Sequence, residues 1–283
     1  MREGRSIVLF GDTDTGKTTL AEEYAKHIKR TEGLDTVYNF ADKGGYGGFK
    51  RLERAKVAKV NAIKEGDDPW IWLADAANGK GVDKNTGLVI IDSGTAAGER
   101  IMDWITKDPR QIGQQKTQKF TVTARDNTSL VVGANNESHY GLVQSFGRDM
   151  MWRSTWLTDQ GIDVLWTFGL WRGEGADGSQ KLGPLFVGKA LTGVLPKWFK
   201  HVFPLVTVPT NPGEAPKHVL YLQEQPEFGG TGMMFANARY PLDADTPLPV
   251  MIEPASLVGA LTCIQIGEAE SEAKMIAEFG GGQ

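Results

Sequence analysis

The chain has 283 residues, of which 40% are hydrophobic and 23% are charged, and its net charge is −4. These values are ordinary for a soluble globular protein, and they exclude a surface that is basic throughout, although not a local basic groove for nucleic acid. The single cysteine, Cys263, cannot form an internal disulfide, and no apolar run is long enough to span a membrane. The four histidines lack metal-ligand spacing and the first strand comes too early for a signal peptide, so we expect a cytoplasmic protein whose metal is Mg²⁺.

A phosphate-binding loop is the most specific feature of the sequence. The apolar run at residues 7–10 leads into GDTDTGKT at residues 11–18, which fits the pattern G-x-x-x-x-G-K-[ST] at every fixed position. Gly11 and Gly16 permit backbone conformations that turn N–H groups toward a phosphate, Lys17 supplies charge to the β- and γ-phosphates, and Thr18 supplies a Mg²⁺ ligand. The helix predicted after the loop adds the positive end of its dipole. The predicted nucleotide-binding residues are Gly11, Asp12, Thr13, Asp14, Thr15, Gly16, Lys17, Thr18 and Thr19.

A second strand is predicted at residues 36–40, followed by an irregular glycine-rich loop at residues 41–48 that contains Asp42. Functional residues of doubly wound sheets lie at such strand ends, so Asp42 is either a catalytic acid or a turn residue. The next stretch, residues 49–64, is rich in Lys and Arg and is predicted to be a basic helix. Such a helix is either a solvated face or a contact for nucleic acid. A further short helix is expected to start at Asp67–Pro69.

The segment LVIIDS at residues 88–93 predicts a buried parallel strand that ends in a Walker B acid, Asp92. At that end of the strand the carboxylate would hold Mg²⁺ through its water shell. Ser93 is suited to cap a helix over residues 94–105, and Glu99 in this helix is a lesser candidate for activating water.

Polar residues dominate the stretch 106–138, where a short hairpin is expected from 121–123 and 130–132. This insertion is either a mobile substrate loop or a surface elaboration. Helical spacing returns over residues 140–160, with Trp152 and Trp156 expected to face inward. A fourth buried strand follows at 163–168, and Thr167 or Arg172 near its end is a candidate sensor of the γ-phosphate.

The remaining segments complete a mostly parallel α/β sheet flanked by helices. We expect a strand at 184–187, a helix over 191–201, and strands at 204–208 and 219–222 that form an antiparallel pair at the sheet edge. A short charged helix is expected beyond Glu268, before a glycine-rich tail. The predicted organisation is a nucleotide-binding domain at 1–245 and a C-terminal extension at 246–283.

With these landmarks, the chain resembles a phage-encoded family of RecA-like ATPases, often described as AAA-type ATP-binding domains. The specific matches are GDTDTGKT and LVIIDS, and the order of the segments at 139–168, 188–208 and 237–241 agrees with them. The resemblance implies a RecA-like core, ATP and Mg²⁺, a homo-oligomer, and action on single-stranded DNA in recombination, replication or repair beside a single-strand DNA-binding or annealing protein. It assigns phosphate and metal roles to Lys17, Thr18 and Asp92, and suggests that Arg239 in NARYP reaches a nucleotide bound by a neighbouring subunit.

The sequence departs from that family in ways that bear on hydrolysis more than on binding. Asp12 and Asp14 place two negative charges in the phosphate loop, where relatives often have small neutral residues. No plain catalytic glutamate follows Asp92, so Asp42 or Glu99 must orient the attacking water. A nucleoside or nucleotide kinase, and a nucleotide-dependent interaction module without hydrolysis, are therefore the alternatives to an ATPase.

Overall fold

The computed structural model describes residues 2–42, 46–64, 66–107, 118–123, 129–134, 139–174, 178–187, 189–190, 193–211, 214–227 and 232–279. Its helical segments are α1 (Lys17–Glu32), α2 (Tyr46–Arg54), α3 (Pro69–Ala77), α4 (Gly94–Lys107), α5 (His139–Ser154), the 3₁₀ segment η2 (Thr155–Gln160), α6 (Leu195–Trp198) and α7 (Leu257–Phe279). Its strands are β1 (Ser6–Phe10), β2 (Asp35–Phe40), β3 (Ala58–Ala62), β4 (Thr86–Asp92), β5 (Gln118–Thr123), β6 (Ser129–Ala134), β7 (Asp163–Glu174), β8 (Gln180–Phe186), β9 (Lys189–Ala190), β10 (His201–Val208), β11 (Lys217–Tyr221), β12 (Gln223–Pro226), β13 (Met233–Ala238) and β14 (Met251–Ile252).

Six parallel strands form the centre of the main sheet, in the order β3-β2-β4-β7-β1-β10. Their apolar runs are buried on both faces, and every residue of β1 and of β4 is buried. Antiparallel strands β11 and β14 extend the sheet beyond β10. This is the mostly parallel α/β class, with antiparallel edge strands, that the sequence predicted. The order places β7 between the strand that precedes the phosphate loop and the strand that ends in Asp92.

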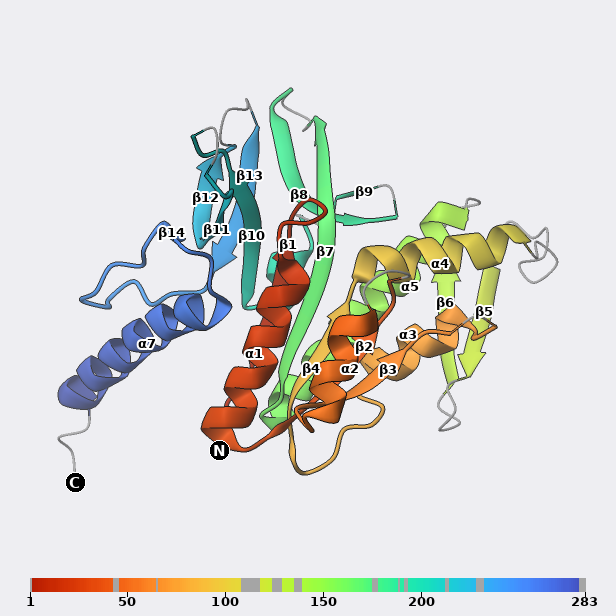
Figure 1. Ribbon diagram of the computed structural model, residues 1–283, viewed down its shortest axis with the longest axis horizontal. Helices are drawn as coiled ribbons and strands as arrows, with labels where there is room; N and C mark the ends of the chain where they lie inside the picture. Colours follow the sequence, from red (N-terminus) through yellow and green to blue (C-terminus); the bar gives the residue numbers. More distant parts are fainter. Residues whose placement is uncertain are drawn as a thin grey trace.

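Helices cover the two faces of this sheet (Figure 1). One face packs α1, α2 and α7 against apolar side chains such as Ile7, Leu9 and Phe203. On the other face of the sheet, α3, α4 and α5 pack against the alternate residues of these strands, including Val8, Phe10 and Trp166. A parallel sheet buried between two layers of helices leaves its strand ends free to carry the functional residues.

Helix ends follow the signals in the sequence. Asp68 caps α3 by accepting hydrogen bonds from the N–H groups of Trp70 and Ile71, with Pro69 in the first turn. Ser93 Oγ accepts the N–H of Ala96 at 3.1 Å, which confirms its predicted capping role at the start of α4. The short helix start at Asp67–Pro69 and the hairpin in the insertion, seen as β5 paired with β6, are also confirmed.

The single basic helix predicted over residues 49–64 is wrong. Helix α2 ends at Arg54, Lys56 takes a left-handed conformation with φ of 55°, and residues 58–62 form β3. Strand β3 pairs in parallel with β2, from Thr36 opposite Ala58 to Phe40 opposite Ala62. The hydrogen bonds gained along that sheet edge override the helical spacing, because local propensity is only a weak prior.

Three further predictions about helices differ from the structure. Trp152 and Trp156 were expected to face inward, but they are 41% and 48% exposed and stack edge to face on each other with centroids 4.8 Å apart. The helix at 191–201 is reduced to the four residues of α6, because Pro196 lies at its start and β10 begins at His201. The short charged helix at the C-terminus is the end of the 23-residue α7.

The late antiparallel strands at the sheet edge are confirmed, since β11 and β14 extend the sheet there and β10 joins them to the parallel strands. Strand β10 pairs in parallel with β1 through Ile7–Phe10 and in antiparallel with β11 further along. It therefore lies beside the strand that leads into the phosphate loop. The fourth strand is longer than predicted: β7 continues to Glu174 and forms an antiparallel hairpin with β8. This hairpin extends beyond the end of the parallel sheet, next to the loop (Figure 1).

Candidate functional site

The phosphate loop connects the end of β1 to the start of α1 and has the geometry its glycines predict. Gly16 has a φ of 93°, a conformation that disfavours any side chain. Gly11 is needed for a different reason from the predicted dihedral freedom: a Cβ there would lie 2.3 Å from the carbonyl oxygen of Leu205 on β10. The close approach of β10 thus fixes where the loop begins.

Lys17 folds back over the loop. Its ammonium group donates hydrogen bonds to the carbonyl oxygens of Gly11 at 2.9 Å and Asp12 at 2.6 Å. Burial lowers the pKa of Lys17, and four carboxylates oppose that shift, in decreasing order Asp92, Asp12, Asp14 and Asp42. The ammonium is therefore surrounded by acids that come from three separate parts of the chain.

Asp92 is the centre of a buried hydrogen-bond cluster. Its carboxylate accepts a hydrogen bond from Thr18 Oγ1 at 2.9 Å and from the Tyr38 hydroxyl at 2.7 Å. The hydroxyl of Thr167, on β7, also donates to it. Asp92 is only 4% exposed, and hydroxyl donors of this kind stabilise a buried carboxylate. The first of these contacts joins the phosphate loop directly to the predicted Walker B acid.

Tyr38 is the residue of this cluster that the sequence did not identify. It lies on β2, is completely buried, and its pKa is raised well above the usual value, first by burial and then by the Asp92 charge. A tyrosine within an apolar strand resembles a core residue, and only the pairing of β2 with β4 brings its hydroxyl to Asp92. Thr167 was a candidate phosphate sensor; its hydroxyl is bound to Asp92.

A cavity of about 680 Å³, which we call the loop cavity, opens beside the phosphate loop. It brings together most of the predicted site, including both acids proposed to orient water, Asp42 and Glu99. The predicted residues that line it are Thr13, Asp14, Gly16, Lys17, Thr18, Thr19, Asp42, Asp92 and Glu99.

Asp42 lies two residues beyond Phe40, which pairs with Asp92 across the β2–β4 ladder. Asp42 is exposed, and its charge acts on the Lys17 ammonium. Glu99 is also exposed and lies on α4, at the side of the loop cavity. The two candidate acids thus approach the cavity from different elements.

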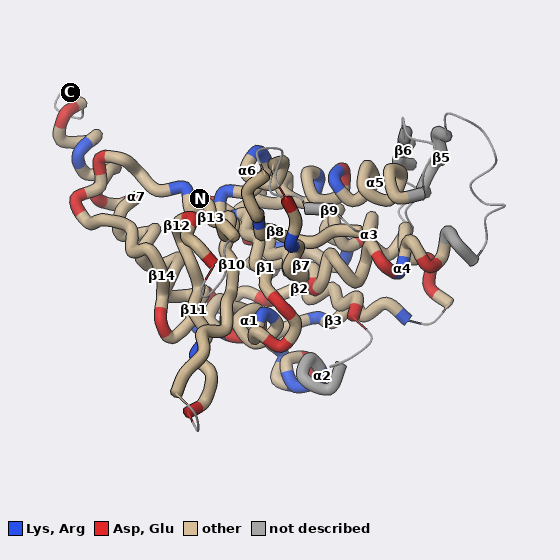
Figure 2. The backbone as a smooth tube through the Cα atoms, turned by 90° about the horizontal axis from the view of Figure 1, so that it is seen from above, with Lys and Arg blue, Asp and Glu red and all other residues tan. Residues whose placement is uncertain are grey.

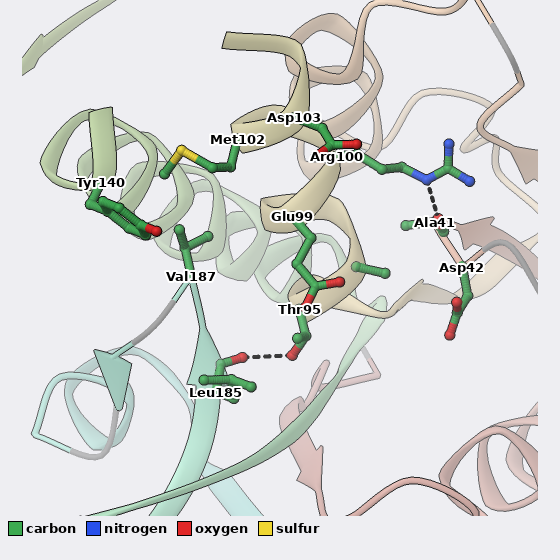
Figure 3. A pocket seen from close by; sticks show the side chains of 11 residues that line it. Ala41, Asp42, Thr95, Glu99, Arg100, Met102, Asp103, Tyr140, Leu185 and Val187 are labelled. Carbon is green, nitrogen blue, oxygen red and sulfur yellow. Dashed lines mark hydrogen bonds between the residues drawn. The ribbon is translucent and has the colours of Figure 1, made fainter. Parts of the chain in front are cut away.

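A second cavity of about 510 Å³ continues from the loop cavity, with which it shares Asp42, Thr95, Ala96 and Glu99. Figure 3 shows its lining from α4, α5 and β8. Arg100 Nε donates to the carbonyl oxygen of Ala41 at 2.6 Å and so ties α4 to the segment that carries Asp42. Thr95 Oγ1 donates to the carbonyl oxygen of Leu185 at 2.6 Å. The shared residues make the second cavity an extension of the same site.

Asp12 and Arg172 are paired, whereas Arg239 lies apart from this site. The Arg172 guanidinium, on the β7 extension, forms two hydrogen bonds with the carboxylate of Asp12. Arg239 follows β13 and donates to the carbonyl oxygen of Pro196 at 3.3 Å. Its neighbour Ala238 pairs with His201, at the N-terminal end of β10 and therefore at the sheet end opposite the loop. Arg239 cannot reach the loop cavity of its own chain.

Part of the insertion falls outside the described residues. Residues 108–117, 124–128 and 135–138, with Arg110, Lys116 and Arg125 among them, are not described, and neither are residues 43–45 of the glycine-rich loop. The last part of that loop is helical instead of irregular, because α2 begins at Tyr46. Within the described part of the chain there is no cluster of three or more histidine, cysteine or acidic side chains placed to hold a metal ion. No helix in that part has both the length and the apolar character needed to cross a bilayer.

Comparisons with known proteins give a distant structural neighbour. No protein-family model matches the sequence, and no curated protein matches it. Among solved structures, the chain is similar to a KaiC-like protein from the hyperthermophilic archaeon Pyrococcus horikoshii, with 14% identity and a TM-score of 0.41 over 77% of this chain and 78% of the other. The fold assignment rests on the strand order and the loop geometry of this chain itself.

Proposed function

We propose that this protein binds ATP with Mg²⁺ in the loop cavity and hydrolyses it. The observation that carries the proposal is the 2.9 Å hydrogen bond from Thr18 to Asp92, which joins a complete phosphate-binding loop to a buried acid at a strand end. Both side chains offer oxygen atoms, which Mg²⁺ prefers, so the residues present fit this metal. When bound there, the ion would neutralise charge on the phosphates.

Lys17 and the backbone N–H groups of the loop are proposed to bind the phosphates. To bind them, the Lys17 ammonium has to leave the carbonyl oxygens of Gly11 and Asp12 and turn toward the ligand. Its charge then stabilises the charge that develops on the transferred phosphoryl group. Removing it in Lys17→Ala should abolish phosphate release.

Asp42 is the acid that we propose to orient the attacking water. The charge of Asp42 acts on Lys17, and the strand that precedes it, β2, lies beside β4, which carries Asp92. Glu99 instead approaches from the side of the cavity. Removal of a general base typically costs about 10²–10⁴-fold in rate. Asp42→Asn should therefore reduce turnover by about that factor while ATP still binds, and Glu99→Gln should have a much smaller effect.

The test is phosphate release and ATP binding measured together for the wild type, Lys17→Ala, Asp42→Asn and Glu99→Gln. Lys26→Ala is a matched control, because Lys26 lies on the same helix and is half-exposed beside Glu22. Tight ATP binding without phosphate release in the wild type would refute hydrolysis and favour a nucleotide-dependent interaction module. An absence of ATP binding would refute the whole proposal.

The sequence resemblance is the basis for a more specific proposal, an ATPase of phage DNA recombination, replication or repair that acts on single-stranded DNA as a homo-oligomer. The basic residues of α2 and the turn after it are the surface proposed for DNA, and Figure 2 marks Lys and Arg positions of α2 in blue. Arg51, Arg54 and Lys56 among them are exposed. Arg239 would have to act on a neighbouring copy. The test is ATP turnover with and without single-stranded DNA at several salt concentrations, together with the mass in solution. Unchanged turnover would refute the DNA role.

A phosphotransferase is the second candidate, and the second cavity favours it. That cavity adjoins the loop cavity through Asp42 and Glu99, so an acceptor bound in it would lie next to the phosphate site. A screen of nucleosides and nucleotides with labelled ATP distinguishes the two functions. Transfer of label to an acceptor, in place of release to water, would make the protein a kinase.

A further inference from the structure

The two acids of the phosphate loop have different surroundings. Asp14 lines the loop cavity, has a φ of 62°, and has no salt-bridge partner within the described part of the chain. Asp12 instead lines a separate cavity of about 320 Å³, which shares only Thr13 with the loop cavity among their lining residues. The chain thus directs one acid toward the phosphate site and the other away from it.

Arg172 is what holds Asp12 in that direction. Its two terminal nitrogens lie 3.1 and 2.9 Å from the two carboxylate oxygens of Asp12, and one of them also lies 3.0 Å from Glu227 Oε1. Paired contacts of this type fix orientation as well as charge. The hydrogen bond to Asp12 is the main reason that the pKa of Arg172 is raised.

The backbone of Arg172 and that of its partner Glu227 are both held by hydrogen-bonded structure. Arg172 belongs to the β7–β8 hairpin, where it pairs with Leu182. The N–H of Glu227 donates to the carbonyl oxygen of Gly232 at 2.7 Å. On the other side, the carbonyl oxygen of Asp12 accepts a hydrogen bond from Lys17. A change at Arg172 can therefore affect Lys17, the residue proposed to bind the phosphates, because Asp12 contacts Arg172 through its side chain and Lys17 through its backbone.

We propose that Arg172 is a positioning residue that sets the affinity of the loop for polyphosphate, by neutralising Asp12 and holding its carboxylate outside the loop cavity. This inference rests on the proposed nucleotide binding and adds the residue that permits an acidic phosphate loop to bind an anion. Without Arg172, Asp12 would be an unpaired negative charge within the loop, free to turn toward the ligand. Repulsion would then grow with the number of phosphates.

The test compares the affinities of ATP and ADP, each with Mg²⁺, for five proteins by titration calorimetry. They are the wild type, Arg172→Ala, Arg172→Lys, Asp12→Asn and the double variant Asp12→Asn/Arg172→Ala. We expect Arg172→Ala to bind ATP about tenfold more weakly, which corresponds to about 1.4 kcal/mol, and to lose less affinity for ADP. Arg172→Lys should be intermediate, because it keeps the charge without the paired geometry.

The double variant separates an electrostatic role from a structural one. Asp12→Asn removes the repelling charge, so in the Arg172→Ala background it should restore most of the lost ATP affinity. The loss of ATP affinity in Arg172→Ala should also be smaller at about 0.5 M salt than at about 0.05 M salt. Over that range the electrostatic screening length falls from above about 10 Å to below about 8 Å. If Arg172→Ala does not fold, Arg172→Lys with and without Asp12→Asn provides the same comparison.

Asp14→Asn is the matched control, since asparagine also tolerates the left-handed conformation at this position. It should bind ATP more tightly than the wild type whether or not Arg172 is present. The proposal is overturned if Arg172→Ala binds ATP as the wild type does, if ATP and ADP lose affinity equally, or if Asp12→Asn restores nothing. A wild type that binds no nucleotide refutes the proposed function instead.

Discussion

His201 gives the protein a built-in sensitivity to acid. It lies on β10, is 1% exposed, and stacks on Phe203 with ring centroids 5.8 Å apart. Within the described part of the chain neither of its ring nitrogens has a hydrogen-bond partner. Burial, together with the positive charges of Arg5, Lys200 and Arg239, lowers the pKa of His201 to about 3. The folded protein therefore keeps this imidazole neutral.

The sign and size of the effect follow from linkage. In the unfolded chain the pKa of a histidine is about 6.5, so between pH 6.5 and 3 the unfolded state binds the additional proton. Stability is complete above pH 6.5 and is lost as the pH falls. At pH 5 the solution is about 1.5 pH units below the pKa of histidine in the unfolded chain, so protonation stabilises the unfolded state by about 2 kcal/mol. That is a large part of the stability of an ordinary domain.

Urea unfolding at pH 7 and pH 5 measures this loss in the wild type and in His201→Phe. Phenylalanine keeps an aromatic ring against Phe203 and leaves no buried nitrogen without a partner, so the variant should fold. We expect the wild type to lose about 2 kcal/mol more than the variant between the two pH values. His201→Leu provides a second non-titrating side chain. Equal losses in the wild type and both variants would refute the assignment of this acid sensitivity to His201.

Two substitutions test other parts of the fold. Tyr38→Phe removes a 2.7 Å hydrogen bond to the buried carboxylate of Asp92 and should lower the unfolding free energy by about 1.5–3 kcal/mol; an unchanged urea midpoint would contradict the contact. Gly147→Ala would place a Cβ 2.2 Å from Cζ of Phe186, a completely buried ring, and should cost about 1–3 kcal/mol. Gly193→Ala is its control, because within the described part of the chain no heavy atom outside its sequence neighbours lies within 4 Å of the added carbon, and its melting temperature should not change.

The parts of the site that are local in sequence could be predicted. The phosphate loop, the strand before it and the helix after it occupy residues 6–32 in one continuous run, and glycine and lysine have fixed roles in such a run. Asp92 was predictable for a similar reason, as a charged residue that ends an apolar strand. The capping roles of Asp68 and Ser93 also depend on residues only two or three positions away.

The parts that depend on sheet neighbours could not be predicted. Residues 58–62 have helical spacing, and only the free edge of β2 makes them a strand. Tyr38 reaches Asp92 because β2 lies beside β4, and a pattern of burial in β2 does not reveal that contact. Trp152 lies two residues after the buried Met150 and therefore on another side of α5, and both Trp152 and Trp156 are exposed.

The loop acids show the same limit at the scale of single charges. Asp12 and Asp14 are two residues apart, and from sequence both oppose the binding of a polyphosphate. The structure distinguishes them through Arg172, which is 160 positions away from Asp12 and reaches it only because β7 continues past the parallel sheet. The number of acids in a phosphate loop is therefore a poor measure of its affinity for anions. The measure that matters is how many of them have no ion-pair partner and line the ligand cavity, and within the described part of the chain that is Asp14 and not Asp12.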